Sequence, residues 1–250
     1  MSLSPKQSLT GLSKKERNLN LILCLLVLGV GWFYYFSQFL SFEKPARDAL
    51  KATAGLLFVA CCLVNLLLTR GMTATKSIRR YQQLLFLGQV FACAGDIVLN
   101  FDFAGGAALF AVGHILFFAA FCALRRPGLR DLLLATLIVA GSVCFLTFYP
   151  RFALGDMAVI VYAYAVIISC MLAKAVSLAM TSTLDKRFRT IVLLGTLLFY
   201  LSDLMLVIHM FGDGGKLFDF LCLLLYYPAE CFLALSVLAG RRLSSGDKRL

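Results

Sequence analysis

The 250-residue sequence has little charge for its length. Charged residues make up 15% of the chain, whereas hydrophobic residues make up 61%. A soluble domain of this length would need far more polar surface. The shortage of charge therefore excludes a soluble globular protein and indicates an integral membrane protein. The apolar stretches are long and do not alternate, which favours membrane-spanning helices over a barrel.

The sequence also lacks the short motifs of common soluble enzymes. No GxSxG, HExxH, phosphate-binding loop or dinucleotide fingerprint stands in a suitable setting, so serine, zinc and nucleotide chemistry are unsupported. Nine cysteines are present, but they form no CxxC pair and no Cys/His group with zinc spacing. We therefore expect the cysteines to serve as small apolar residues within helices rather than as a disulfide framework. We also expect no metal and no other cofactor.

Eight apolar runs are each long enough to cross a bilayer, which needs about 20 mostly apolar residues. The expected spans are 18–40, 50–69, 82–101, 105–124, 131–149, 157–181, 189–211 and 217–239. The first run is too long for a signal-peptide core and is predicted to be retained. No linker or low-complexity tract interrupts the chain. We therefore expect one all-α membrane domain at 18–240, between tails at 1–17 and 241–250.

Basic residues are concentrated in alternate loops. Of the 24 Lys and Arg residues, 18 lie in the two tails and the loops at 70–80, 125–130 and 182–190, whereas five lie in the remaining loops. By the positive-inside rule both termini are cytoplasmic, which requires an even number of spans. The net charge of +11 then reflects topology and attraction to anionic lipid rather than nucleic-acid binding. Compact loops and short tails favour a bacterial inner membrane over the endoplasmic reticulum.

A motif containing a carboxylate occurs twice within the apolar runs. Residues 88–99 read GQVFACAGDIVL and residues 195–206 read GTLLFYLSDLML, which places Asp96 and Asp203 after a small residue in each. An ionisable group within a span costs about 2.5–3.5 kcal/mol on insertion scales and marks a functional site by default. The motifs fall on the third and seventh spans, which run in the same direction. They predict two parallel four-helix halves with a weak internal repeat.

Packing of the two halves about their axis would bring Asp96 and Asp203 together at similar depth. Burial and mutual repulsion would then keep one carboxyl protonated while the other is ionised, which provides an acid and a base from one residue type. The structural alternative is that each Asp only bonds neighbouring helices together. Small residues would allow close helix approach on the same two spans: Gly88, Gly95, Gly195 and Ser202.

Further polar residues lie at a similar depth and indicate a water-accessible cavity. They are Asn100, one turn after the first Asp, His114 in the fourth span, and Tyr226 and Glu230 on one face of the eighth. Lys174 in the sixth span has three possible roles: its ammonium reaches the membrane surface, pairs with a carboxylate or binds a phosphate. A retinal Schiff base on this lysine is disfavoured by the eight spans.

The longer segments around these residues also have a recognisable pattern. They read LGQVFACAGDIVLNFD and ALFAVGHILFFAAF, then GTLLFYLSDLMLVIHMF and LLLYYPAECFLALS, with Tyr149-Pro150 and Met171 to Ala175 between them. In this order, over residues 50–240, they resemble the YhhN-like lysoplasmalogenase family of eight-span membrane proteins. The resemblance implies hydrolysis of the vinyl-ether bond of a lysophospholipid (lysoplasmalogen). The products would be a fatty aldehyde and a glycerophospho-head group.

The resemblance also implies site residues. Four fall in the family's motifs by matching position: Asp96, His114, Asp203 and Tyr226. Two departures, Glu230 where Gln is usual and His209 where Asn is common, imply a shifted pH optimum or a different substrate. One protonated carboxyl would deliver a proton to the alkene carbon, and an ionised one would stabilise the oxocarbenium-like cation and activate water. The lipid tail would enter laterally between helices, and Lys174 would contact the phosphate.

Two other functions stay open at this point. Parallel halves with buried carboxylates also suit a proton-coupled membrane transporter. A lipid-binding or scaffold protein would use the same carboxylates for stability alone. Hydrolysis is the preferred hypothesis because the paired motifs and the family resemblance both point to it.

Overall fold

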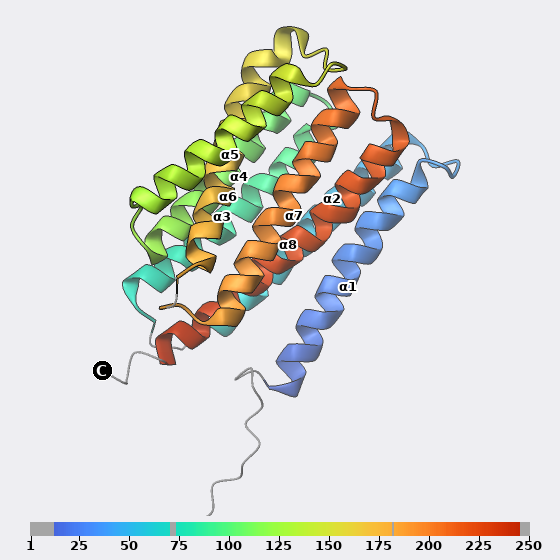
Figure 1. Ribbon diagram of the computed structural model, residues 1–250. Helices are drawn as coiled ribbons and strands as arrows, with labels where there is room; N and C mark the ends of the chain where they lie inside the picture. Colours follow the sequence, from blue (N-terminus) through green and yellow to red (C-terminus); the bar gives the residue numbers. More distant parts are fainter. Residues whose placement is uncertain (1–12, 71–73, 182, 246–250) are drawn as a thin grey trace, which may run out of the picture.

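All of the regular structure described for this chain is helical. The computed structural model describes residues 13–70, 74–181 and 183–245, which form the bundle of long helices in Figure 1. The helices are α1 (Lys14–Ser37), α2 (Lys44–Leu68), α3 (Lys76–Val98), α4 (Phe103–Leu124), α5 (Leu129–Phe148), α6 (Ala158–Ala179), α7 (Lys186–Phe211) and α8 (Gly215–Ser245), with a short turn η1 (Gly155–Met157) before α6. The all-α prediction is confirmed, and each expected run corresponds to one helix.

Several helices begin before the apolar run that predicted them. α2 and α3 start at Lys44 and Lys76, each six residues ahead of the expected positions 50 and 82. Polar chemistry determines such starts, because the first backbone N–H groups of a helix need acceptors. In α3 the Thr75 side chain accepts a hydrogen bond from the backbone N–H of Ile78. Hydrophobicity locates the spans, whereas capping residues determine where the helices begin.

The helical domain reaches into both expected tails. Residues 14–17 form the first turn of α1, and residues 241–245 form the end of α8. The remaining tail residues, 1–12 and 246–250, lie outside the described part of the chain. The helices therefore extend from residue 14 to residue 245, whereas the expected limits of the membrane domain, residues 18 and 240, stay a prediction.

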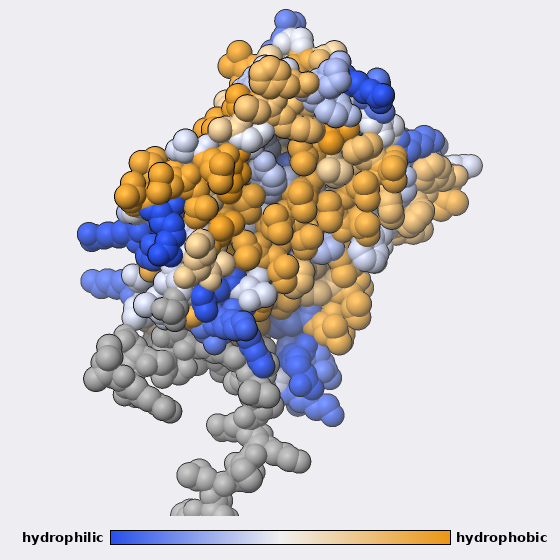
Figure 2. Space-filling view, in the orientation of Figure 1, coloured by the Kyte–Doolittle hydropathy of each residue, from blue (hydrophilic) through white to orange (hydrophobic). Residues whose placement is uncertain are grey.

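Seven of the eight helices are long and apolar enough to cross a membrane, so the protein is an integral membrane protein. Hydrophobic residues cover most of the face shown in Figure 2, and hydrophilic residues gather near the helix ends. The exception is α3, which is long enough with 23 residues but falls short of the same standard of apolarity. Eight sufficiently apolar spans are expected from the sequence, and seven of the helices reach that standard.

Helix α3 is more polar because one of its faces bonds to other helices. It packs against α2, α4 and α8, and its polar side chains bond to the α8 backbone. The side-chain amide of Gln82 donates to the carbonyl of Val237 at 3.1 Å, and that of Gln89 donates to the carbonyl of Glu230 at 2.9 Å. Buried polar groups are tolerated in a membrane protein when the protein itself supplies their partners. A sequence scale that measures apolarity alone therefore underrates this helix.

Small residues let the helices that carry the motifs approach their neighbours. The most extensive helix contacts are α3 with α4 and α7 with α8. A Cβ at Gly88 would overlap the Phe117 ring of α4, and a Cβ at Gly195 would lie 3.1 Å from the Leu233 side chain of α8. The predicted close approach at these glycines is confirmed.

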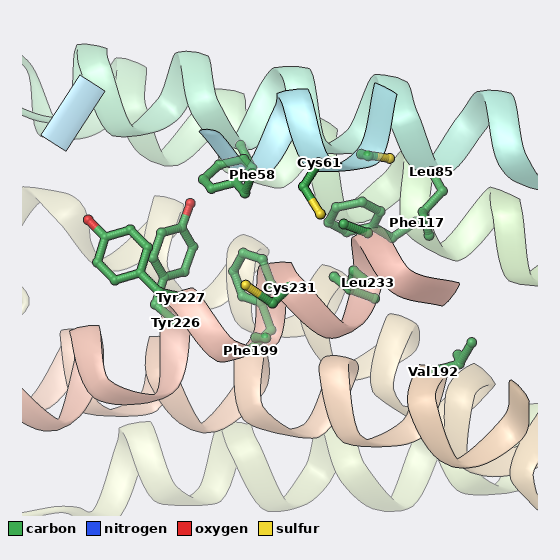
Figure 3. Packing of buried hydrophobic residues seen from close by; sticks show 14 of the residues in the cluster. Phe58, Cys61, Leu85, Phe117, Val192, Phe199, Tyr226, Tyr227, Cys231 and Leu233 are labelled. Carbon is green, nitrogen blue, oxygen red and sulfur yellow. The ribbon is translucent and has the colours of Figure 1, made fainter. Parts of the chain in front are cut away.

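The core is centred on α8, which contacts α1, α2, α3 and α7. Figure 3 shows Phe58 of α2, Phe199 of α7 and the Tyr226–Tyr227 pair of α8 gathered in this core. The Tyr226 ring lies edge-on to Phe58 and Phe199, with centroid distances of 6.1 and 5.3 Å. Edge-to-face pairs of this kind fix ring orientation as well as burying area. The phenol of Tyr226 is thereby held toward the interior of the bundle.

We expect Gly88→Val to lower the free energy of unfolding by about 1–3 kcal/mol, because the added side chain overlaps Phe117 in a packed interface. Thermal unfolding of purified protein in detergent, followed by circular dichroism, would show a lower Tm. Gly29→Val is the matched control, since nothing lies within 4 Å of a Cβ at Gly29. An equal Tm for the two variants would contradict the tight α3–α4 packing.

Candidate active site

Asp96 lies buried near the carboxyl end of α3 and has partners from two other helices. The Tyr226 phenol of α8 donates a hydrogen bond of 2.8 Å to its Oδ2 atom. The Lys51 ammonium of α2 lies 3.6 Å from its Oδ1 atom and donates to the side-chain oxygen of Asn100 at 3.4 Å. Asp96, Asn100 and Tyr226, all expected at the site, are therefore brought together around a lysine.

Asp203 on α7 has a different set of partners. The Tyr164 phenol of α6 donates to its Oδ2 atom at 2.6 Å, and Nε2 of His114 on α4 lies 3.2 Å from the same oxygen. The phenol and the imidazole also lie 2.7 Å apart. The Asp203 carboxyl, the Tyr164 phenol and the His114 imidazole thus contact one another in pairs, as a closed triangle. Each of these three groups can hold a proton. The predicted proximity of His114 and Asp203 is present in the structure.

The two carboxylates line one cavity of about 230 Å³, bounded mainly by α3, α7 and α8, with further residues from α1, α2 and α4. Asn100, Tyr226 and Lys51 also line it. The cavity lies toward the end of the bundle where α3 turns into α4 and α7 turns into α8, since Asn100 belongs to the first turn. The parallel motifs thus converge on a shared space, as their placement on helices of equal direction indicated.

A second cavity also has Asp203 in its lining. It has a volume of about 260 Å³, lies between α5, α6 and α7, and includes Tyr164 and Asp203 in its lining. Its other walls are mainly apolar, with Phe145, Leu146, Val161 and Ile168 among them. Asp203 therefore stands where an apolar cavity meets the cavity that holds Asp96. A molecule with a hydrocarbon tail and a polar head matches this arrangement.

The two residues that depart from the family pattern occupy different positions. Glu230 is fully buried behind Tyr226, and neither of its carboxyl oxygens has a hydrogen-bond partner among the described residues. His209 lies in the last turn of α7, where its Nδ1 atom is 2.9 Å from the carbonyl of Gly215, and it lines the same cavity as Asp96. Both departures are thus close to the candidate site.

Lys174 lies in a separate network. Its ammonium is 2.9 Å from an Asp131 carboxylate oxygen, and Arg125 donates to both oxygens of the same carboxylate at 2.9 Å. Of its three expected roles, the structure shows pairing with a carboxylate. Lys174 does not line the cavity of Asp96 or the apolar cavity beside Asp203. The structure therefore does not bring it together with the other candidate residues.

Two residues of the site escape sequence reasoning. Lys51 counts among the loop charges because it lies at the very start of the expected span 50–69, and Tyr164 is one aromatic residue among many. The available signal for Lys51 is its spacing of four residues from Arg47 just before an apolar run, which places two cations on one helix face. For Tyr164 the signal is a phenol in the middle of a span, because a buried hydroxyl needs a hydrogen-bond partner.

The two carboxyl groups differ in their electrostatic surroundings. Lys51 places a positive charge 3.6 Å from Asp96. Asp203 faces a phenol and an imidazole, both of which can hold or transfer a proton. One cavity is therefore lined by the Asp96 carboxylate, which lies beside a cation, and by the Asp203 carboxyl, which contacts a phenol and an imidazole. These are suitable parts for general acid–base chemistry on a molecule bound between them.

Comparisons with known proteins agree with this geometry. Residues 46–237 match the YhhN family. Two relatives are the lysoplasmalogenase TMEM86A of Bos taurus, 30% identical over 63% of this chain, and that of Homo sapiens, 28% identical over 72% of it. The chain spans 66% of the bovine protein, just under two thirds, and 75% of the human one. No solved structure matches.

The match includes both motif helices and all of the carboxylate partners. It starts within α2, before Lys51, and ends within α8, after Glu230, so α1 and its cavity-lining Tyr34 precede it. The similarity thus concerns most of the helical domain, from α2 to α8. The chain therefore belongs to the YhhN family.

Proposed function

We propose that this protein is an intramembrane hydrolase that cleaves the vinyl-ether bond of lysoplasmalogens. The observation that carries the proposal is the cavity that Asp96 and Asp203 share, joined at Asp203 to an apolar cavity. A lysoplasmalogen has its reactive bond at the junction between a hydrocarbon tail and a polar head. The two relatives named lysoplasmalogenase support the same substrate class.

The proposed reaction begins with transfer of a proton from a carboxyl group to the alkene carbon remote from the ether oxygen. The resulting oxocarbenium-like cation is stabilised by the second, ionised carboxylate. Water then adds to the cationic carbon and gives up a proton to a carboxylate, which restores the pair. The hemiacetal that results breaks into a fatty aldehyde and a glycerol hydroxyl on the head group. No cofactor is needed for these steps.

The supporting residues have defined places in this scheme. Tyr226 and Asn100 line the cavity on the Asp96 side, and Tyr164 and His114 bond to Asp203. Glu230 lies behind Tyr226 as a buried carboxyl that can supply a further proton. The apolar cavity between α5, α6 and α7 receives the hydrocarbon tail, which enters laterally from the bilayer.

We further propose that all eight helices span the bilayer as two parallel halves, α1–α4 and α5–α8. Helix α3 has 23 residues and is about 35 Å long, enough for a bilayer core of about 30 Å. The helix contacts support the repeat, in which α2 corresponds to α6 and α8 to α4. The contact of α2 with α8 has its counterpart in the contact of α6 with α4. The partners follow it too: Asp96 is bonded from α2 and α8, and Asp203 from α6 and α4. Cytoplasmic termini and a bacterial inner membrane stay predictions from the loops.

Replacing either carboxylate is expected to abolish most of the activity. Asp96→Asn and Asp203→Asn should each lower aldehyde release from a 1-alkenyl lysophospholipid by about 10²–10⁴-fold, the usual contribution of general acid–base catalysis. The assay uses purified protein in detergent micelles, where no second compartment exists. Asp213→Asn is the matched control, because Asp213 has an exposed side chain in the α7–α8 turn.

The outcomes separate the three functional hypotheses. Full activity in either Asn variant would contradict the mechanism. If the unaltered protein released no aldehyde but drove pH-gradient-dependent uptake into liposomes, the proton-coupled transporter would be favoured. If the two variants changed stability alone, a lipid-binding or scaffold role would remain.

Tyr164→Phe is expected to lower kcat by about tenfold or more, since it removes a hydrogen bond to a charged group that contributes about 1.5–3 kcal/mol. Its phenol lies 2.6 Å from Asp203, and the ring can stay in place without the hydroxyl. Tyr162→Phe is the control, because its phenol bonds to Thr147 on α5, away from Asp203. Equal kcat values for the two variants would show that the Tyr164 hydroxyl has no part in the reaction.

A further inference from the structure

Lys51 carries a buried positive charge whose two polar contacts are both long. The residue is 6% exposed, and its ammonium lies 3.6 Å from Asp96 and 3.4 Å from the side-chain oxygen of Asn100. Both distances exceed the roughly 2.7–2.9 Å of a charge-assisted hydrogen bond. An ammonium group has three donors, so two long contacts leave a donor for another acceptor in the cavity.

Arg47 precedes Lys51 by one helical turn and supplies a second cation on the same side. Its Nε atom is buried and has no hydrogen-bond partner within the described residues. Arg47 lines a narrow cavity of about 30 Å³, which shares Tyr34 and Asp219 with the cavity that holds the two carboxylates. A guanidinium presents its donors in a planar fork that suits phosphate oxygens. Two cations with spare hydrogen-bond donors, Lys51 and Arg47, therefore lie where the two cavities share lining residues.

The acidic residue at this end of the site is Asp219. It lines both cavities, and the side-chain amide of Gln38 lies 3.5 Å from its Oδ2 atom. A head group that contains a phosphate and an amine can place its negative part beside Lys51 and its positive part beside Asp219. The charges at this end match a zwitterion better than a simple anion.

We propose that Lys51 and Arg47 form the site that binds the head-group phosphate of the substrate. This inference rests on the proposed hydrolase function. Only the glycerol unit separates the phosphate of a lysoplasmalogen from its vinyl ether. A phosphate held at Lys51 therefore keeps the reacting bond close to Asp96, which lies 3.6 Å from the same ammonium. Lys174, which the sequence suggested for this contact, is paired with Asp131 instead.

The test compares two substrates that differ only in the phosphate-containing head group. For Lys51→Gln, kcat/KM with a 1-alkenyl lysophospholipid should fall at least about tenfold further than kcat/KM with the neutral 1-alkenylglycerol, because a charge-assisted contact is lost with the first alone. Lys51→Arg keeps the charge and should retain the preference for the phospholipid. Lys216→Gln, an exposed lysine stacked on Phe39, is the control. An equal loss on both substrates would overturn the inference and assign Lys51 to Asp96 alone.

Binding separates this inference from the hydrolase proposal. An uncleavable 1-alkyl lysophospholipid should bind the unaltered protein at least about tenfold more tightly than it binds Lys51→Gln, whereas 1-alkylglycerol should bind both equally. That result would support the phosphate site even if no aldehyde were ever released, in which case the hydrolase proposal alone would fail. Glycerophosphoethanolamine should compete with the phospholipid more strongly than inorganic phosphate does. Equal competition by the two would overturn the assignment to a lipid head group.

Discussion

A carboxyl group among apolar helices must find its partners inside the protein, and this requirement governs the arrangement of the helices. Asp96 of α3 and Asp203 of α7 are each bonded by side chains from two other helices. These contacts join six helices in all. In a bilayer no water is available to replace a missing partner. Small residues support the same arrangement, since Gly88 lets α4 close on α3 and Gly195 lets α8 close on α7. Helix packing and site assembly therefore depend on the same contacts.

In the proposed repeat, the partners of the two carboxylates correspond in position but differ in chemistry. Lys51 of α2 then corresponds to Tyr164 of α6, and Tyr226 of α8 to His114 of α4. A repeat with identical partners would give two carboxyl groups of equal proton affinity, which is a poor basis for acid–base catalysis. The divergence of side chains on a similar backbone places a cation beside one carboxyl and a proton-transferring triangle beside the other.

The proposed substrate-binding surface also divides between the two proposed halves. The apolar cavity is built from α5, α6 and α7, whereas the cations proposed for the phosphate lie on α2. An amphipathic lipid can therefore lie across the interface between the halves, with its reactive bond at the carboxylates. Glu230 and Gln89 extend the polar interior behind Tyr226 and keep α3 bonded to α8.

The sequence by itself determined the all-helical membrane fold, the position of each helix along the chain and the likeness of the two carboxylate motifs. These features depend on local composition and on spacing, which a linear sequence displays directly. It also identified Asp96, Asn100, His114, Asp203 and Tyr226, because a polar group within an apolar run is conspicuous. It underrated α3, since apolarity is not required of a helix face that bonds to other helices.

Only the tertiary structure decided which polar groups meet. Lys51 and Lys174 both look like cations near a span, yet one lies beside Asp96 and the other pairs with Asp131. The difference depends on which face of each helix turns inward and on which helices pack together over separations of many residues. Tyr164 joined the site for the same reason, because the contact of α6 with α4 and α7 brings its hydroxyl to Asp203. A partner chosen through long-range packing leaves no mark in the local sequence.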